Sequence, residues 1–384
     1  MLLALASAAI ETMKPENMKS LSTARVIFVI MKPAILVTGG AGYVGSHTVA
    51  ALLEKPNTDV EVVVVDNLSN AYRSEGQKKP EAIKIIEELT GKTIHFYDVD
   101  IRDANALREV FEKHDVACVI HFAALKAVGE SVQKPLEYYQ ANITGTCTLF
   151  DVMRAFGVYK LVYSSSCTVY GEPESLPLGE GHPTGRGLAS PYGKSKYFCE
   201  EIMKDICRSD RKWSVISLRY FNPVGAHRSG RIGEDPAGVP NNLMPFIAKV
   251  AVGRLKELQV FGADYPTIDG TGVRDYIHVE DLADGHVKAI KLFSQTGFNG
   301  FHAVNLGTGT GYSVLQMVKA FEEVSGKKIP YKIVGRRDGD IAANYADVSL
   351  SHRMLGWRAT RTLRDMCADT WRWQSNNPDG YKST

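Results

Sequence analysis

The feature that most constrains the fold is an alternation of short apolar strands with helical stretches through the first half of the chain. Runs rich in Val and Ile predict strands, and between most of them apolar residues recur every three or four positions, as on one face of a helix. The expected strands cover residues 34–38, 60–65, 92–97, 116–122, 161–165 and 215–218, and the expected helices cover 43–54, 104–113, 135–156 and 192–208. Continuously apolar strands that alternate with helices are typical of a parallel sheet covered on both faces. The sequence therefore predicts an α/β fold with a doubly wound parallel sheet.

The second half of the chain has a different composition. After about residue 222 it is rich in Gly, Pro and Asn, with short helices expected at 242–252 and 314–325. This change predicts two domains, one covering residues 31–221 and a smaller one covering residues 222–384. At 384 residues the chain is long enough for both to bury a core.

The first thirty residues stand apart from both domains. Residues 1–10 are apolar like the middle of a signal peptide, but no basic residues precede them. Met31, Lys32 and Pro33 then resemble a second translation start. We expect residues 1–30 to be a dispensable, disordered extension, and a cleaved secretory signal is the alternative interpretation.

Charge and cysteine usage argue against several classes of protein. The formal net charge is +2, with Lys and Arg spread along the chain, so no nucleic-acid-binding or polybasic membrane surface is expected. The six cysteines include no CxxC pair, which favours reduced cytosolic thiols over disulfides or zinc. No apolar run reaches the roughly 20 residues that a membrane-spanning helix requires. We expect a cytoplasmic protein with no metal, no nucleic acid partner and no membrane segment.

A glycine-rich loop follows the first expected strand. It has a GxxGxxG pattern, with glycines at Gly39, Gly42 and Gly45. Such a loop lets the backbone approach a pyrophosphate at a helix terminus, although glycine-rich turns also occur for purely steric reasons. The second strand ends in Asp66, whose carboxylate can hydrogen-bond both hydroxyls of an adenosine ribose and would repel a 2′-phosphate. With Asn67 beside it, the pattern predicts NAD rather than NADP; the alternative is that Asp66 only ends the strand.

A tyrosine and a lysine open the last helix of the first half. Tyr192 and Lys196 are four residues apart and so share one helix face, a YxxxK pattern that also arises by chance. A lysine cation about 4 Å from a phenol contributes roughly 4 kcal/mol at an effective dielectric of about 20, enough to bring the phenolate into use near neutral pH. Upstream, Ser164, Ser165 and Ser166 end a strand on the expected ligand side of the sheet. Together these residues resemble the triad of the short-chain dehydrogenase/reductase superfamily.

Six segments extend this resemblance to the UDP-glucose 4-epimerase family. The segments are residues 39–45, 119–131, 164–171, 191–196, 218–223 and 272–279, and the resemblance runs from about residue 31 to residue 381. The chain departs from the family in its first thirty residues and in one apparent extra residue between Gly181 and Ser190. It also departs at Cys167, where the family commonly has Ala, and at Asn344.

The resemblance implies a role for each site residue. Tyr192 is the base, Lys196 tunes it and holds the nicotinamide ribose, and Ser166 hydrogen-bonds the sugar hydroxyl, leaving Ser164 and Ser165 structural. The expected cofactor-binding residues are Gly39, Gly42, Tyr43, Val44, Gly45, Asp66, Asn67, Asp100, Ile101, Phe122, Ala123, Lys126, Tyr192, Lys196 and Tyr220. The expected substrate-binding residues are Lys126, Ser166, Tyr192, Asn222, Asn242, Leu243, Val260, Phe261, Arg274, Arg337, Asp340 and Asn344.

The activity implied is C4 epimerisation of a UDP-hexose, with UDP-glucose and UDP-galactose as the pair, in galactose metabolism. The base removes the C4 hydroxyl proton while the C4 hydride moves to bound NAD⁺, giving a 4-keto sugar that turns its other face before reduction. The guanidinium groups of Arg274 and Arg337 suit bidentate contacts with the diphosphate, although a solvated surface pair is the alternative. The family also implies a homodimer, built from the helices at 135–156 and 192–208 as a four-helix bundle.

The residue at position 344 bears on which sugars the site accepts. In the family a Tyr there fills the space that an N-acetyl group would need, and Asn344 is smaller, so UDP-N-acetylglucosamine and UDP-N-acetylgalactosamine are expected as further substrates. The alternative is that Asn344 only satisfies backbone groups in its loop.

Two other functions fit the sequence less well. Related dehydratases and decarboxylases carry acidic residues just before the Val-Tyr-Gly stretch, where this chain has Cys167 and Thr168. A non-catalytic NAD-binding regulator would tolerate loss of the Tyr-Lys pair, which this chain retains.

Overall fold

The computed structural model describes residues 32–55, 60–236, 238–337 and 339–383. Residues Pro33–Thr384 form one compact unit, and the description that follows concerns that unit. The expected extension at residues 1–30 lies outside the described residues.

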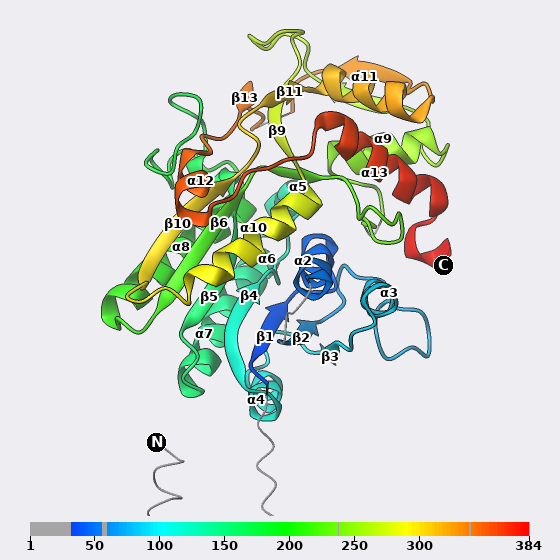
Figure 1. The fold of residues 1–384 in the computed structure, drawn as a ribbon. Coiled ribbons are helices and arrows are strands. Elements are labelled where there is room, and N and C mark those ends of the chain that lie inside the picture. The colour runs from blue at the N-terminus through cyan, green and yellow to red at the C-terminus, as the bar shows by residue number, and fades with distance from the viewer. Residues whose placement is uncertain (1–31, 56–59, 237, 338, 384) are drawn as a thin grey trace, which may run out of the picture. The chain divides into compact units, whose positions relative to one another are not determined.

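A seven-stranded parallel sheet forms the centre of the unit, and it confirms the predicted fold class (Figure 1). Its strands are β1 (Ala34–Thr38), β2 (Glu61–Asp66), β3 (His95–Asp98), β4 (Val116–His121), β5 (Lys160–Ser166), β6 (Ser214–Tyr220) and β10 (Gly300–Leu306). Their order is β10-β6-β5-β4-β1-β2-β3, so the direction of winding reverses between β1 and β4. In a doubly wound sheet a ligand binds at the carboxyl ends of the strands around this reversal.

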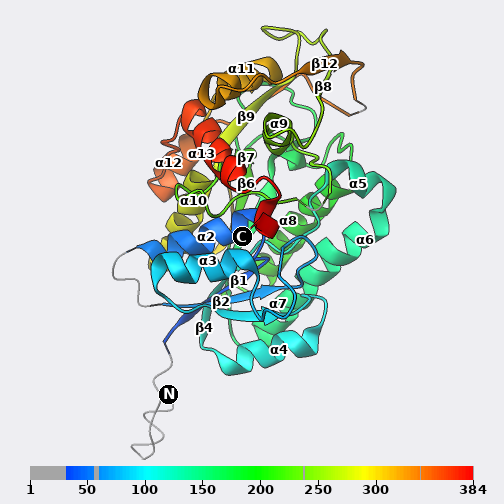
Figure 2. The ribbon, with the colours of Figure 1, turned by 90° about the vertical axis from the view of Figure 1, so that its right-hand side faces the viewer.

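Helices cover both faces of the sheet, as Figure 2 shows. One face packs against α2 (Tyr43–Glu54), α3 (Glu81–Thr90) and α10 (Val279–Leu292), and the other against α4 (Ala104–Lys113), α7 (Gly145–Ala155) and α8 (Pro191–Ser209). The short helices α5 (Val128–Gln133) and α6 (Pro135–Tyr139) pack against α8. Successive residues of a strand point to opposite faces, so β2 places Val62 and Val64 in one core and Val63 and Val65 in the other. This explains why the central strands are apolar along their whole length.

The prediction of a single helix at 135–156 is wrong in one respect. The structure divides it into α6, a π-helical segment (Gln140–Thr144) and α7. The side chain of Asn142, in the π-helical segment, is almost fully buried and bonds both the N–H and the C=O of Leu125, at 2.8 and 3.0 Å. It also donates to Ser195 Oγ of α8 at 2.9 Å, so the wider turn serves to tie the loop after β4 to α8.

Smaller elements follow β6. Four short strands, β7 (Asn222–Val224), β9 (Val273–His278), β11 (Gly311–Ser313) and β13 (Ala343–Asn344), pair around β9, and β8 (Leu258–Phe261) pairs with β12 (Tyr331–Val334). They pack with α9 (Leu243–Ala251), α11 (Val314–Ser325) and α13 (Leu363–Asn376) around a third core. The remaining helix is α12 (Ser349–Leu355). The second half also supplies β10, which pairs with β6, and the domain boundary at residue 222 stays a prediction.

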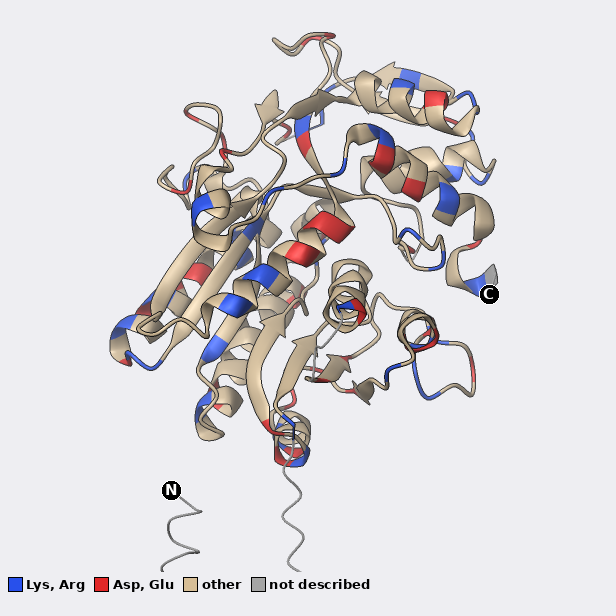
Figure 3. Cartoon of the chain, in the orientation of Figure 1, with Lys and Arg blue, Asp and Glu red and all other residues tan. Residues whose placement is uncertain are grey.

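Acidic and basic residues are spread over many of the helices, and several helices carry both signs, as Figure 3 shows. On α10, Glu280 and Asp281 lie in the first turn and Lys291 lies in the last, an arrangement that complements the helix dipole. Within the described ranges, no helix is long and apolar enough to cross a membrane.

Candidate active site

A cavity of about 840 Å³ opens at the carboxyl ends of the parallel strands. Its wall includes the residue that follows β1, Gly39, and the residue that follows β4, Phe122. It also includes the last residues of β2, β5 and β6, which are Asp66, Ser166 and Tyr220. From there the cavity continues to Arg274 and Arg337 in the second half of the chain. Its volume lies in the upper part of the usual range for ligand sites, about 300–1,000 Å³.

The glycine loop has room for a ligand and none for side chains. Gly39 has φ +68°, and a Cβ there would lie 2.6 Å from the backbone N of Ala123. A Cβ on Gly45 would lie 2.2 Å from the carbonyl oxygen of Gly39. Gly42, the N-cap of α2, provides no side-chain cap, so the first N–H groups of the helix remain open to a pyrophosphate.

Asp66 ends β2 beside this loop and is buried. Its two carboxylate oxygens accept from the backbone N–H of Ala41 at 3.0 Å and of Leu68 at 2.9 Å. Burial raises the pKa of Asp66, and these N–H groups oppose the rise. A carboxylate oxygen can accept more than one hydrogen bond, so Asp66 retains capacity for ribose hydroxyls. The adjacent Asn67 donates to Asp100 at 2.9 Å, and the loop and the carboxylate together fit the adenosine half of NAD.

The first two turns of α8 bring Tyr192 and Lys196 into the wall of the cavity. The helix starts here because Ser190 accepts from the N–H of Gly193 at 3.1 Å and Pro191 occupies the first helical position. The Lys196 ammonium donates to the carbonyl oxygen of Ser164 at 2.5 Å and lies 6.0 Å from the centre of the Tyr192 ring.

The pKa values of this pair differ from the sequence-based expectation. Burial raises the pKa of Tyr192 to about 12, and the hydrogen bond with Ser166 opposes the rise. Burial lowers the pKa of Lys196 to about 8, against the raising effect of Cys199 and Glu200. The expected lowering of the phenol pKa by Lys196 is therefore not seen, because the ammonium group is directed at a backbone carbonyl and burial is the larger effect.

The serines at the end of β5 separate into different environments. Ser165 donates to Glu200 Oε1 at 2.7 Å, which makes it part of the packing beneath α8. Ser164 contributes its carbonyl oxygen to Lys196. Ser166 accepts a 3.2 Å bond from the N–H of Thr168, contacts Tyr192 and Cys167, and lines the cavity.

Two arginines converge at the far end of the cavity. Arg274 donates to the carbonyl oxygens of Val273 and Ile341 at 2.8 and 2.9 Å, which fixes its guanidinium group 3.8 Å from Asp340. Arg337 pairs with the same carboxylate at 3.1 Å. Two cations around one carboxylate leave a net positive charge, which suits a diphosphate.

The cavity unites nearly all residues expected from the sequence. Every residue in the expected catalytic, cofactor-binding and substrate-binding sets lines it except Asn344. Asn344 is 6% exposed, and its amide nitrogen lies 3.8 Å from the sulfur of Cys167, which does line the cavity. The roles of the individual residues stay predictions.

Glu234 lines the cavity but was not expected there. Its Oε1 lies 2.9 Å from the Lys126 ammonium and 3.4 Å from Asn242 Nδ2, so it joins a residue of the expected cofactor set to one of the substrate set. Glu234 comes from a Gly- and Pro-rich loop with no recognisable pattern, and only the folded chain brings it near Lys126.

The cofactor site, the Tyr-Lys pair and the paired arginines together define an NAD-dependent enzyme acting on a nucleotide-linked substrate. The model of the NAD dependent epimerase/dehydratase family matches residues 35–316, and the chain belongs to that family.

Similar proteins show to which branch of the family the chain belongs. UDP-glucose 4-epimerase of Drosophila melanogaster is 61% identical over 349 residues, covering 91% of this chain and 98% of the relative. The Homo sapiens UDP-glucose 4-epimerase is 58% identical over 352 residues, covering 91% and 99%. The crystal structure of the Bifidobacterium longum UDP-glucose 4-epimerase, in complex with NAD⁺ and UDP, matches with a TM-score of 0.84 at 51% identity, covering 91% and 100%. Within its family the chain therefore belongs with the UDP-glucose 4-epimerases, as an NAD-dependent isomerase, and the family expected from the sequence motifs is confirmed.

Proposed function

We propose that this chain interconverts UDP-glucose and UDP-galactose by inverting C4 of the hexose through a 4-keto intermediate. One observation carries the proposal: Tyr192, Lys196 and Ser166 meet in the middle of a continuous cavity that has a dinucleotide loop at one end and paired arginines at the other. A bound cofactor and a bound nucleotide sugar would bring their reactive ends together at this position.

Each residue of the site has a different role in the proposed reaction. Tyr192 takes the proton of the C4 hydroxyl, Ser166 donates a hydrogen bond to the same oxygen, and the Lys196 ammonium stabilises the phenolate. The glycine loop and Asp66 would hold NAD⁺, which would supply the acceptor and donor of the C4 hydride. The paired arginines hold the diphosphate during both oxidation and reduction of C4. The sugar can therefore turn after the oxidation and before the reduction while the nucleotide stays fixed.

The direct test is incubation of the purified chain with UDP-galactose and no added cofactor. We expect UDP-glucose to form and an NADH absorbance band to grow during turnover. Absence of both, with every UDP-hexose, would favour a non-catalytic NAD-binding regulator. Elimination of water from the sugar would favour a dehydratase, but Cys167 and Thr168 offer no carboxyl group for that chemistry.

We further propose that the chain accepts UDP-N-acetylglucosamine and UDP-N-acetylgalactosamine. The Oδ1 atom of Asn344 is buried and has no hydrogen-bond partner among the described residues. This oxygen therefore does not accept from a backbone N–H of its loop, which the alternative interpretation would require. A tyrosine in this position would have to displace its neighbours, and overpacking a closed site costs about 1–3 kcal/mol. One neutral hydrogen bond contributes only about 1 kcal/mol, so steric exclusion decides the specificity.

The substrate proposal is tested by the ratio of kcat/KM for the acetylated and plain sugars. We expect Asn344→Tyr to lower this ratio by at least about tenfold, because about 1.4 kcal/mol of exclusion corresponds to that factor. Asn344→Ser, which keeps the site small, is the control and should preserve the ratio. An unchanged ratio in the tyrosine variant, or discrimination beyond about a thousandfold in the parent, contradicts the proposal.

We also propose a homodimer, formed through α6, α7 and α8. Val132 on α5, Leu136 on α6 and Phe198 on α8 are 61, 70 and 43% exposed in the single chain, which supports burial of this face by a second copy. The replacement of both Leu136 and Phe198 by Glu should then yield monomers in light scattering at micromolar concentration. Ile333→Glu, at an exposed apolar position on β12, should leave the dimer intact. A monomeric parent would overturn the proposal.

The compartment we propose is the cytoplasm. Within the described ranges all six cysteines are free thiols, and five of them are buried, which suits a reducing environment. Fractionation of cells that express the full chain tests this; recovery from the secreted fraction would contradict it.

A further inference from the structure

A second cluster of reactive side chains lies at the opposite edge of the sheet from the cavity. Glu61 is the first residue of β2, His95 is the first residue of β3, and His114 ends α4 just before β4. Asp66, at the cavity, is the other end of β2, so at about 3.3 Å per residue the two ends are about 16 Å apart. The cluster is therefore independent of the active site.

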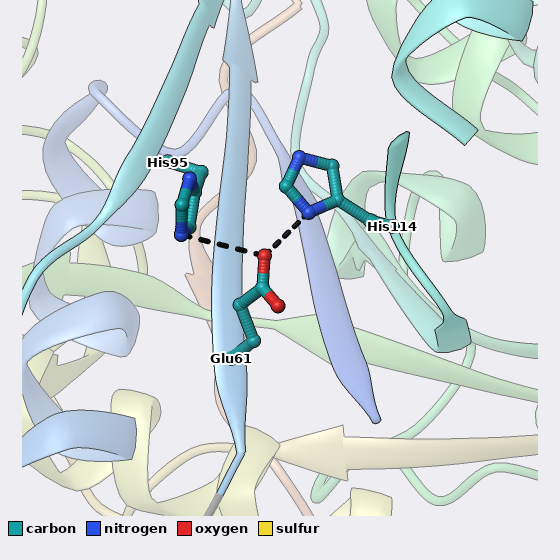
Figure 4. A group of neighbouring side chains, drawn as sticks. All are labelled: Glu61, His95 and His114. Atoms are coloured by element: carbon teal, nitrogen blue, oxygen red, sulfur yellow. Dashed lines mark ion pairs between the residues drawn. The ribbon is translucent and has the colours of Figure 1, made fainter. Parts of the chain in front are cut away.

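The sheet geometry explains why these side chains meet. His95 pairs with Val63 of β2, and paired residues of parallel strands point to the same face, which Glu61 also shares as the second residue before Val63. That face is covered by α4, whose last turn delivers His114. Figure 4 shows the two imidazole rings on either side of the Glu61 carboxylate, each with a nitrogen turned toward the same oxygen.

We propose that Glu61, His95 and His114 form a binding site for a divalent transition-metal ion of the Zn²⁺ type. The ligand atoms are His95 Nε2, His114 Nδ1 and a carboxylate oxygen of Glu61, and all three lie within 4.8 Å of one another. Bonds of about 2.1 Å in a tetrahedral zinc site place neighbouring ligand atoms about 3.4 Å apart. His95 Nε2 already lies 3.4 Å from Glu61 Oε1, and His114 Nδ1 is in direct contact with the same oxygen.

The surroundings of the cluster also suit a metal. His114 is almost fully buried, and its Nε2 lies 2.8 Å from the hydroxyl of Tyr97, a contact that can orient the ring while Nδ1 coordinates. Among the described residues, Glu61 forms no ion pair with a Lys or Arg, so a bound cation would not have to displace one. His95 is 46% exposed, which leaves a path from solvent and room for the ring to adjust.

The donor set selects the class of metal. Two imidazoles and one carboxylate suit Zn²⁺, Co²⁺ or Ni²⁺, whereas Mg²⁺ and Ca²⁺ require oxygen ligands. Three protein ligands leave the fourth position to water. The bound ion would join β2, β3 and the α4–β4 connection, so its effect is expected on stability rather than on turnover.

The test is titration of the metal-stripped full chain with Co²⁺, followed by visible absorbance, and with Zn²⁺, followed by calorimetry and thermal unfolding. We expect one equivalent of either ion to bind and the unfolding temperature to rise with Zn²⁺. His95→Ala and Glu61→Gln should each weaken binding by at least about tenfold, because each removes one ligand. His95 is exposed, so its variant should fold normally.

His352→Ala, at an exposed histidine on α12, is the matched control and should bind the metal as the parent does. Absence of binding in the parent overturns the proposal, as does binding that is equal in the parent and in both ligand variants. In the first case the cluster is a hydrogen-bonded carboxylate–imidazole group only.

Discussion

At the residue scale, Tyr192 and Lys196 are affected by burial in opposite directions. Burial raises the pKa of the phenol to about 12 and lowers the pKa of the ammonium group to about 8, so in both residues the neutral form is favoured. At pH 7 these pKa values leave Tyr192 protonated and Lys196 mainly charged.

The role of Tyr192 is tested by Tyr192→Phe. Only the oxygen that transfers the proton is removed, so we expect kcat to fall by about a hundredfold to ten-thousandfold while the purified protein retains its NAD. Tyr163→Phe is the matched control, because Tyr163 also lies near Lys196, with its ring centre 4.8 Å from the ammonium, yet does not line the cavity. If Tyr192→Phe stays within about tenfold of the parent, Tyr192 is not the base.

The lowered pKa of Lys196 predicts that activity declines at alkaline pH. Its ammonium form is required and is lost as the pH rises through the lowered pKa, so kcat/KM should decline above about pH 8. Ser166→Ala retains Lys196 and should show a lower rate with the same alkaline limb. A profile that stays flat to pH 10, the region where an ordinary lysine titrates, would show that Lys196 is not the titrating group.

At the scale of elements, a buried ion pair holds α8 against the sheet. Glu200, one turn after Lys196, bonds Arg219 of β6 at 2.6 Å, with 0% and 3% of the two side chains exposed. It also accepts from Ser165 at 2.7 Å and from Ser217 at 2.8 Å. Burial would raise the pKa of Glu200, but Arg219 and the serines hold it below its usual value. The network thereby fixes the helix that carries the Tyr-Lys pair over the strand that carries the serines.

We therefore predict that Glu200→Gln destabilises the protein by about 3 kcal/mol in denaturant unfolding, because Arg219 loses its buried counter-ion. Glu201→Gln is the control on the same helix. Its partner Lys204, at 2.6 Å, is at the surface, so its loss should cost less than about 1 kcal/mol. Equal effects of the two substitutions would refute a structural role for the buried pair.

The elements themselves were largely predictable from periodicity. The helices at 43–54, 104–113 and 314–325 match the structure, because each carries a regular apolar face. The break at the π-helical segment was not predictable, since it depends on the bonds from Asn142 to a loop and to α8. The strand β10 was also missed, because its pairing with β6 is settled by tertiary packing.

At the scale of the whole molecule, the cavity joins residues from both halves of the chain. The glycine loop and Asp66 could be located from the sequence because they lie at the carboxyl ends of β1 and β2, where a doubly wound fold places its ligand. Most of the other expected cofactor residues came from the family resemblance. Glu234 could not be located in either way, because a loop conformation brings it to Lys126. The Glu61, His95 and His114 cluster was missed for a related reason: its members have no characteristic spacing and meet only through strand register.

The central claim is that C4 is inverted by removal and return of one hydride inside this cavity. The most direct measurement uses UDP-galactose that carries deuterium at C4, with the purified chain in ordinary water and the product analysed by NMR. We predict UDP-glucose that retains the deuterium at C4, because the hydride returns to the carbon it left. Loss of the deuterium to solvent would show that the carbon is deprotonated instead and would rule out hydride transfer.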